Sequence, residues 1–153
     1  MIPNRIVIDT NVCLDLFVFR DPRWSRLASA LQSGAVVAVT RTDCRDEWRL
    51  VLAYACFALD ADSQAAAGAA FDALITCLPA ASPSPSQTLT PLPRCSDPDD
   101  QKFLEVARDA AATSLITKDK ALLKLAGKCR RSGLFSIHKP EAWLATFDPP
   151  ATF

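Results

Sequence analysis

Hydrophobic and polar residues along the chain follow two patterns, one typical of strands and the other of helices. The segment 5–9, with the sequence RIVID, carries consecutive apolar residues without alternation, which predicts a strand buried on both faces. Three further short apolar segments are also predicted to be strands: 35–40 (AVVAVT), 113–117 (TSLIT) and 133–138 (GLFSIH).

Apolar residues at helical spacing fill the segments between these strands. The clearest case is 21–34, where we expect Asp21 to cap a helix, Pro22 to occupy its first position and Gly34 to end it. A short helix is expected to begin at Thr10 or Asn11. Further helices are predicted over 41–60, 61–78, 97–112, 118–128 and 139–147.

The order of these elements predicts the fold class. Strands that are separated by helices favour an α/β fold with a parallel sheet and right-handed crossovers, so we expect a three-layer α/β/α sandwich with about four to five strands. The segment 79–96, rich in Pro and Ser, is predicted to be a long surface loop, with room for a short edge strand. The part after this loop is too small for a core of its own, so 1–153 is expected to form one domain.

Charge and hydropathy narrow the class of protein further. Lys plus Arg and Asp plus Glu each total 17, so no overall basic field points to nucleic acid, although a local patch can still bind it. No apolar run approaches the roughly 20 residues that cross a membrane. The N-terminus has no signal-peptide pattern. We therefore expect a cytoplasmic protein.

The cysteines and aromatic residues are predicted to be structural. With no CxxC motif and no Cys/His pairing, the six cysteines are expected to be small buried hydrophobes: Cys13, Cys44, Cys56, Cys77, Cys95 and Cys129. His138 is the single histidine, so any histidine-centred catalytic site would depend on it alone. The three tryptophans lie at apolar helical positions and are expected in the core or at an interface: Trp24, Trp48 and Trp143.

Acidic residues gather where the predicted strands end. Asp9 ends the first strand, and Asp119 follows the third after one lysine. Asp46 and Glu47 lie early in the helix after the second strand, and the run 97–100 (DPDD) opens the helix before the third. The carboxyl ends of parallel strands meet at one sheet edge, where ligands bind. Clustered carboxylates repel one another unless a cation lies among them, and oxygen ligands favour Mg²⁺ or Mn²⁺.

With these motifs in place, the chain resembles the PIN domain family, small metal-dependent ribonucleases that include VapC-like toxins of toxin–antitoxin modules. The motifs that carry the resemblance are IVIDTNV, DEWRLVL, DPDDQKFLEVA, SLITKDKALLKL and IHKPEAWL. The resemblance implies that four acids bind one or two Mg²⁺ or Mn²⁺ ions, and that a metal-bound water attacks an RNA phosphodiester. These acids are Asp9, Glu47, Asp100 and Asp119, and Thr10 and Asn11 would orient Asp9 or a water on the metal.

Several assignments stay open at this point. Asp46 is a one-residue alternative to Glu47, and Asp97 and Asp99 are alternatives to Asp100 because the Pro/Ser-rich loop obscures the register. Each acid taken alone also fits a helix cap, a helix N-terminus or a solvated ion pair, and only the joint pattern favours a site. Basic residues near the same edge are candidates for RNA phosphate contacts, although they also suit a solvated face: Lys118, Lys120, Lys124, Arg41 and Arg45.

Two other functions compete with the ribonuclease hypothesis. A phosphatase of the haloacid dehalogenase type also begins with a strand that ends in Asp, but it needs a second Asp two residues later as general acid, where this chain has Asn11. A catalytically inactive PIN fold that serves as a binding module is the other alternative. We expect an Mg²⁺/Mn²⁺-dependent endoribonuclease, the toxin of a toxin–antitoxin module, with an RNA substrate, an antitoxin partner and a homodimeric state by family analogy.

Overall fold

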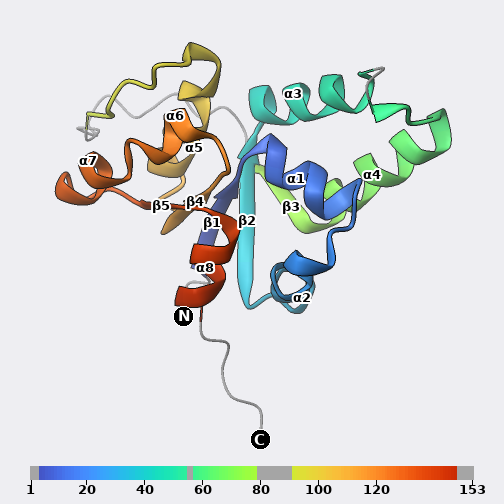
Figure 1. Cartoon of the computed structure of the whole chain (residues 1–153), viewed down its shortest axis with the longest axis horizontal. Helices are drawn as coiled ribbons and strands as arrows, with labels where there is room; N and C mark the ends of the chain where they lie inside the picture. The colour runs from blue at the N-terminus through green and yellow to red at the C-terminus, as the bar shows by residue number, and fades with distance from the viewer. Residues whose placement is uncertain (1–3, 55–56, 79–90, 148–153) are drawn as a thin grey trace, which may run out of the picture.

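The structure is a computed structural model that describes residues 4–54, 57–78 and 91–147. Five parallel strands form one sheet in the order β3-β2-β1-β4-β5 (Figure 1). The strands are β1 (Asn4–Ile8), β2 (Val36–Arg41), β3 (Ile75–Leu78), β4 (Ser114–Ile116) and β5 (Ser136–His138). The predicted α/β/α sandwich with a parallel central sheet is confirmed.

Helices connect the strands and cover the sheet. They are α1 (Thr10–Phe17), α2 (Ser25–Ser33), α3 (Thr42–Leu52), α4 (Ala61–Leu74), α5 (Gln101–Asp109), α6 (Lys120–Leu123), α7 (Ala126–Arg131) and α8 (Pro140–Thr146). Two 3-10 turns, η1 (Pro22–Trp24) and η3 (Pro98–Asp100), precede α2 and α5. Helical segments lie between successive strands, as parallel pairing requires.

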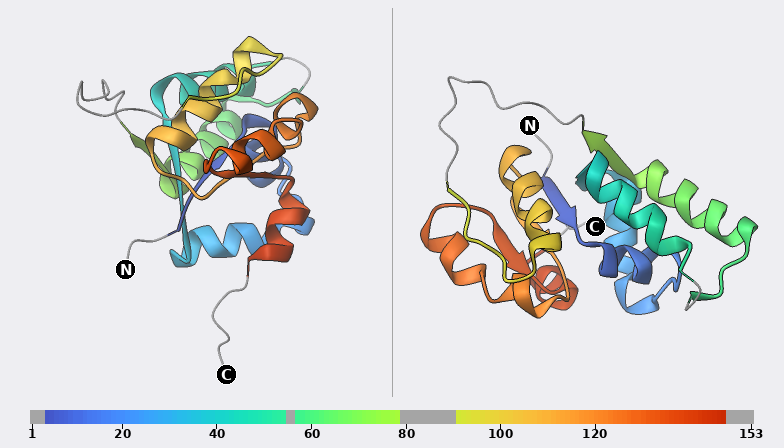
Figure 2. Two further views of the ribbon diagram at one scale, coloured as in Figure 1. Left: turned by 90° about the vertical axis from the view of Figure 1, so that its left-hand side faces the viewer. Right: turned by 90° about the horizontal axis from the view of Figure 1, so that it is seen from above.

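The central strand β1 separates two hydrophobic clusters. Ile6 and Ile8 belong to the cluster that includes residues of α1, α2, α4 and α8, whereas Val7 belongs to the cluster built around α5, α6 and α7. Figure 2 shows α1 and α4 on one side of β1 and α5 on the other. The unbroken apolar run in β1 therefore reflects burial on both faces, as predicted.

Aromatic and cysteine side chains take the structural places expected of them. The exposed fractions of Trp24, Trp48 and Trp143 are 6%, 1% and 3%, and all three pack in the first cluster. Four cysteines are buried and Cys77 is partly buried, whereas Cys56 lies outside the described residues. The buried cysteines are Cys13, Cys44, Cys95 and Cys129.

One strand was assigned to a helix in the sequence-based prediction. The Ala-rich helix α4 ends at Leu74, and the last four residues of the predicted segment 61–78 form β3 instead. β3 pairs with β2 in parallel register, from Ala38 opposite Ile75 to Arg41 opposite Leu78. Ile and Thr favour strands over helices. The free edge of β2 therefore decides the conformation of a segment whose local pattern is ambiguous.

Two other predicted helices differ from their expected extent. The segment 41–60 is helical only to Leu52, and Ala58 has φ 50°, which a continuing right-handed helix excludes. The segment 118–128 is divided into α6 and α7, because the N–H of Leu125 donates to the Leu122 carbonyl in a tighter turn at 3.0 Å. Neither change moves a strand end.

Part of the predicted Pro/Ser-rich loop, residues 79–90, lies outside the described residues, and so does the edge strand suggested for it. Residues 91–97 have no regular secondary structure, as expected of a loop. Among the described residues, no helix has the length and apolar character needed to span a membrane.

Two glycines, one at the end of α2 and one inside α4, offer a matched test of backbone conformation. Gly34 ends α2 with φ 80°, whereas Gly68 lies within α4, and neither would place an added Cβ within 4 Å of another group. We expect Gly34→Ala to lower the free energy of unfolding by about 1 kcal/mol because of the left-handed backbone. Gly68→Ala should raise it by roughly 0.5–1 kcal/mol. Urea titration of both variants measures the difference, and equal effects would contradict it.

Candidate metal centre

Asp9 lies at the junction of β1, β4 and α1. Its N–H donates to the Ile116 carbonyl at 2.9 Å, which extends the β1–β4 pairing by one residue. The side chain caps α1, since Oδ1 accepts from the Thr10 N–H at 2.6 Å. Oδ2 accepts from the Thr117 hydroxyl at 2.7 Å. The expected helix cap is present, but the carboxylate also faces the end of β4.

Burial sets the ionisation of this carboxyl group. Asp9 is 4% exposed, and desolvation raises its pKa to about 6 despite the hydrogen bonds from Thr117 and Thr10, which lower it. The negative charges of Glu47 and Asp119 raise the pKa further. A carboxylate that is costly to ionise in this position would be stabilised by a nearby cation.

Glu47 approaches Asp9 from α3. Its Oε2 accepts a hydrogen bond from the Thr10 hydroxyl, and its Oε1 accepts from Lys102 Nζ at 2.9 Å. Thr10 is therefore a direct link between the end of β1 and α3. Asn11 lies beside it, and its Oδ1 is buried without a hydrogen-bond partner among the described residues. Asp46 is exposed, on a face of α3 that it does not share with Glu47.

Three aspartates from two other segments complete the acidic edge. Asp97 and Asp100 belong to η3 and its cap, and Asp119 follows β4. Each offers a carboxylate oxygen, and these three oxygens lie within 4.8 Å of one another. Asp99 is exposed, and its backbone carbonyl accepts from Lys102.

The ionisation of Asp100 and Asp119 is linked. Burial raises the pKa of Asp100 to about 8, and the nearby carboxylates of Asp119 and Asp9 add to the increase. The pKa of Asp119 is lowered, first by its contact with Asp100 and also by the Ala121 N–H, which donates to Oδ1 at 2.8 Å. Asp100 is thus hard to ionise beside the Asp119 carboxylate, and a bound cation would favour its ionised form.

The donor set fits a hard divalent cation. Oδ2 of Asp100 is buried and has no hydrogen-bond partner among the described residues, although a carboxylate oxygen in that position is costly to leave unsatisfied. The grouped ligand atoms are all carboxylate oxygens, the kind that Mg²⁺ and Mn²⁺ prefer. The acids predicted from four separate sequence segments therefore converge at one edge, with Asp9 and Glu47 beside the Asp97–Asp100–Asp119 group.

The candidate RNA-binding residues differ in how strongly they are engaged. Arg41 binds Asp43 at 2.7 Å and Glu105 at 2.8 Å, and Lys118 binds the buried Asp15 at 2.7 Å. Lys120 and Lys124 are exposed on and just after α6. Arg45 is partly buried, and its Nε has no hydrogen-bond partner among the described residues. Arg41 is thus held in an ion-pair network and is the least available of the five.

Two residues of this edge were not predicted. Thr117 is fully buried, donates to Asp9 and accepts from the Asp119 N–H at 2.9 Å, so it joins two of the predicted acids. Its position two residues before Asp119, directly after a strand, is the signal that could have identified it. Lys102 pairs with Glu47, and its position two residues after Asp100 was the corresponding signal.

Comparison with known families identifies the family of the chain. A family model described as PIN domain matches residues 5–121, a range that contains every acid discussed above. The chain belongs to the PIN domain family. No match was found among curated proteins. PIN domains are generally nucleases that act on RNA, and they typically use divalent metal ions.

The raised pKa values predict an unusual pH dependence for this PIN domain in EDTA. The folded chain binds protons at Asp9 up to about pH 6 and at Asp100 up to about pH 8, whereas unfolded aspartates release them near pH 4. Stability should therefore fall as the pH rises from about 4 to about 8. The raised pKa of Asp9 alone accounts for about 3 kcal/mol of this loss in the free energy of unfolding. Acids with lowered pKa values, such as Asp43 and Asp119, act below about pH 4, whereas the lowered pKa of His138 opposes the trend near and below its unfolded value of 6.5.

Urea unfolding in EDTA at a series of pH values measures this effect. Asp9→Asn should flatten the profile between about pH 4 and 6, and Asp100→Asn should flatten it up to about pH 8. Asp62→Asn, at an exposed position in the first turn of α4, should leave the slope unchanged. A wild-type stability that rises through this range would contradict the burial-dominated ionisation of Asp9 and Asp100.

Thr117 offers a second test, because its hydroxyl contacts two acids. Thr117→Val keeps the side-chain shape but removes the donor to Asp9 Oδ2 and the acceptor for the Asp119 N–H. We expect a loss of about 1–3 kcal/mol in the free energy of unfolding. The pKa of Asp9, followed by carboxyl NMR, should rise further, because the hydrogen bond that lowers it is lost. Thr117→Ser should restore both values, and an unchanged pKa in the valine variant would refute the role of the hydroxyl.

Proposed function

We propose that this PIN domain is an Mg²⁺- or Mn²⁺-dependent endoribonuclease. The observation that carries the proposal is the meeting of carboxylates from four chain segments at the carboxyl edge of the sheet, beside the orphaned Oδ2 of Asp100. Asp9, Glu47, Asp100 and Asp119 are the residues that we assign to the metal site, with Asp97 adjacent to it. A divalent cation there would lower the pKa of a water and stabilise charge that develops on the phosphate.

The residues around these acids prepare the site. Thr117 and the Thr10 N–H hold both oxygens of Asp9 in place within the core, and the Thr10 hydroxyl orients Glu47. Asp100 gives up its proton when a cation binds, since the opposite charge favours the ionised form. Asn11, with a buried unsatisfied oxygen, is available to accept a hydrogen bond from a water near Asp9.

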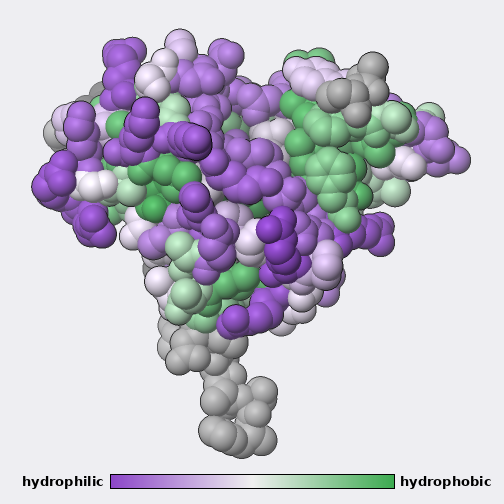
Figure 3. Space-filling model, in the orientation of Figure 1, coloured by the Kyte–Doolittle hydropathy of each residue, from purple (hydrophilic) through white to green (hydrophobic). Residues whose placement is uncertain are grey.

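The toxin role and its partners belong to the same proposal. Figure 3 shows hydrophobic side chains on the surface over the ends of α1 and α3. Phe19, Leu50 and Tyr54 are 57%, 66% and 54% exposed, and Phe57 packs against both Phe19 and Tyr54. Exposed apolar groups of this size favour a protein partner. A second copy of the chain, or an antitoxin as in toxin–antitoxin modules, would fit this role. We place the protein in the cytoplasm as part of the same proposal.

The alternative functions have less support. A phosphatase of the haloacid dehalogenase type requires a carboxyl group at position 11, where Asn11 cannot transfer a proton, and the family match is to PIN domains. The buried carboxyl group of Asp9 has a raised pKa, as is common at catalytic sites, and a binding module without catalysis would gain nothing from it.

RNA cleavage by the purified protein tests the proposal. With Mn²⁺, the wild-type protein should cleave a mixture of structured and single-stranded RNA, and EDTA should abolish this activity. Asp9→Asn and Asp119→Asn should each reduce cleavage by about 100-fold or more, because a metal ion contributes several kcal/mol to transition-state stabilisation. The exposed Asp62→Asn serves as the matched control and should retain activity. Full activity in both site variants would refute the assignment.

A further inference from the structure

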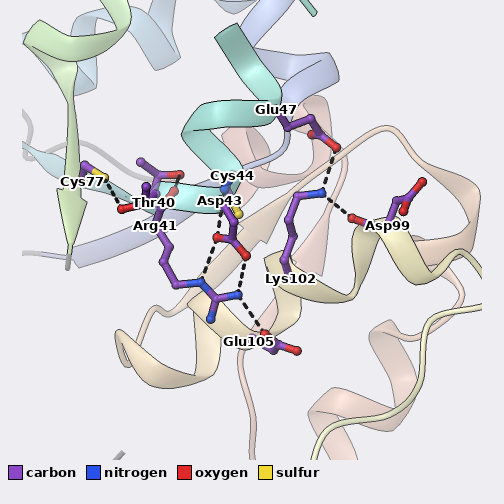
Figure 4. A network of polar contacts seen from close by, with 10 residues as sticks. Thr40, Arg41, Asp43, Cys44, Glu47, Cys77, Asp99, Lys102 and Glu105 are labelled. Atoms are coloured by element: carbon purple, nitrogen blue, oxygen red, sulfur yellow. Dashed lines mark hydrogen bonds and ion pairs between the residues drawn. The ribbon is translucent and has the colours of Figure 1, made fainter. Parts of the chain in front are cut away.

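Lys102 brings a positive charge into the acidic edge. It is the second residue of α5, and its side chain reaches toward α3, where Nζ lies 2.9 Å from Glu47 Oε1 (Figure 4). Nζ also donates to the Asp99 carbonyl at 2.5 Å and lies 5.3 Å from the centre of the Phe103 ring. The side chain is 19% exposed. These contacts hold the ammonium group between α3 and η3.

This ion pair occupies one of the four predicted metal ligands. Glu47 accepts from Thr10 at one oxygen and from Lys102 at the other, so both of its oxygens are in use. A divalent cation on Glu47 would have to displace the ammonium group or lie beside it. Like charges at such short range repel strongly where water is partly excluded.

The rest of the acidic edge is different. Carboxylate oxygens of Asp97, Asp100 and Asp119 lie within 4.8 Å of one another, and Oδ2 of Asp100 has no hydrogen-bond partner among the described residues. The ion pairs of the described lysines are with Glu47 and Asp15 and not with these three acids, and the Lys102 charge acts on Asp100 only at longer range. The edge is therefore divided into an open half around Asp100 and a half that Lys102 already neutralises.

We infer that the Lys102 ammonium group replaces a second metal ion, so that this PIN domain binds a single divalent cation, in the half around Asp100 and Asp119. Within the metal site proposed above, Glu47 then acts as a positioning residue that holds Lys102 and Thr10, and the ligands are the other acids. The inference rests on the proposed nuclease function and refines it, because it distinguishes a one-metal site from a two-metal site.

The geometry also leaves Lys102 one N–H donor that can bind the RNA substrate. An ammonium group has three N–H donors, and the described contacts use one for Glu47 and one for the Asp99 carbonyl. The third donor is available to a phosphate oxygen of RNA, held next to the single cation. Lys102 would thus supply the second positive charge that a two-metal site places on the transferring phosphate.

Counting bound Mn²⁺ tests the inference without measuring activity. Isothermal titration calorimetry of the full chain should give one Mn²⁺ per wild-type protein, and the electron paramagnetic resonance spectrum of the saturated protein should show an isolated ion. Lys102→Met should bind two, with the spectrum of a spin-coupled pair, because Glu47 becomes available. Lys102→Arg keeps the charge and should bind one. The double variant Lys102→Met/Glu47→Gln should return to one.

The exposed Lys139 offers a matched control, since Lys139→Met removes the same charge before α8 and should leave the count at one. Two ions in the wild-type protein would overturn the inference, and so would one ion in a folded Lys102→Met. If circular dichroism shows that Lys102→Met does not fold, the number of Mn²⁺ ions bound by the wild-type protein decides between one and two metal ions.

The RNA assay separates this inference from the proposed function. Cleavage by a wild-type protein that binds two ions would overturn the single-metal inference and leave the nuclease assignment intact. One bound ion without cleavage of any RNA would overturn the nuclease assignment and leave the single-ion site standing. No bound ion would overturn both.

Discussion

A carboxyl group withdrawn from water at the end of β1 is the constraint on which the acidic edge depends. Asp9 can be buried because the Thr10 N–H and the Thr117 hydroxyl satisfy its two oxygens, and Thr117 in turn holds the N–H of Asp119. The parallel register of β1 and β4, with Ile8 opposite Ile116, brings these residues together. The same bonds that stabilise the strand ends therefore also position two of the acids.

Two ion pairs join α5 to β2 and α3 at the other side of the acidic edge. Lys102 binds Glu47, and Arg41 at the end of β2 binds Glu105 (Figure 4). Both pairs join segments more than fifty residues apart, and both lie where side chains are partly shielded from water. Partly buried pairs are screened less than surface pairs. They favour one relative placement of α3 and α5, and with it the distance between Glu47 and the η3 acids.

The acidic edge lowers the stability of the metal-free fold. Burial and mutual repulsion raise the pKa of Asp9 to about 6 and that of Asp100 to about 8, so the metal-free chain holds protons that ordinary aspartates would lose. A bound cation would relieve the repulsion, and its binding free energy would then add to the stability of the fold.

The sequence alone determined the sandwich, because the unbroken apolar run of β1 and the helical spacing around it depend on local pattern and burial. It also indicated Asp9 and Asp119, since residues that follow parallel strands meet at one edge, whereas Glu47 and Asp100 were chosen among neighbouring acids through the resemblance to PIN domains. Only the tertiary structure decided that Ile75–Leu78 pairs with β2 instead of extending α4. It alone placed Asp97 beside Asp100 and Asp119, and joined Lys102 to Glu47 and Thr117 to Asp9. These contacts link residues distant in sequence, and local spacing carries no information about which distant partner a side chain meets.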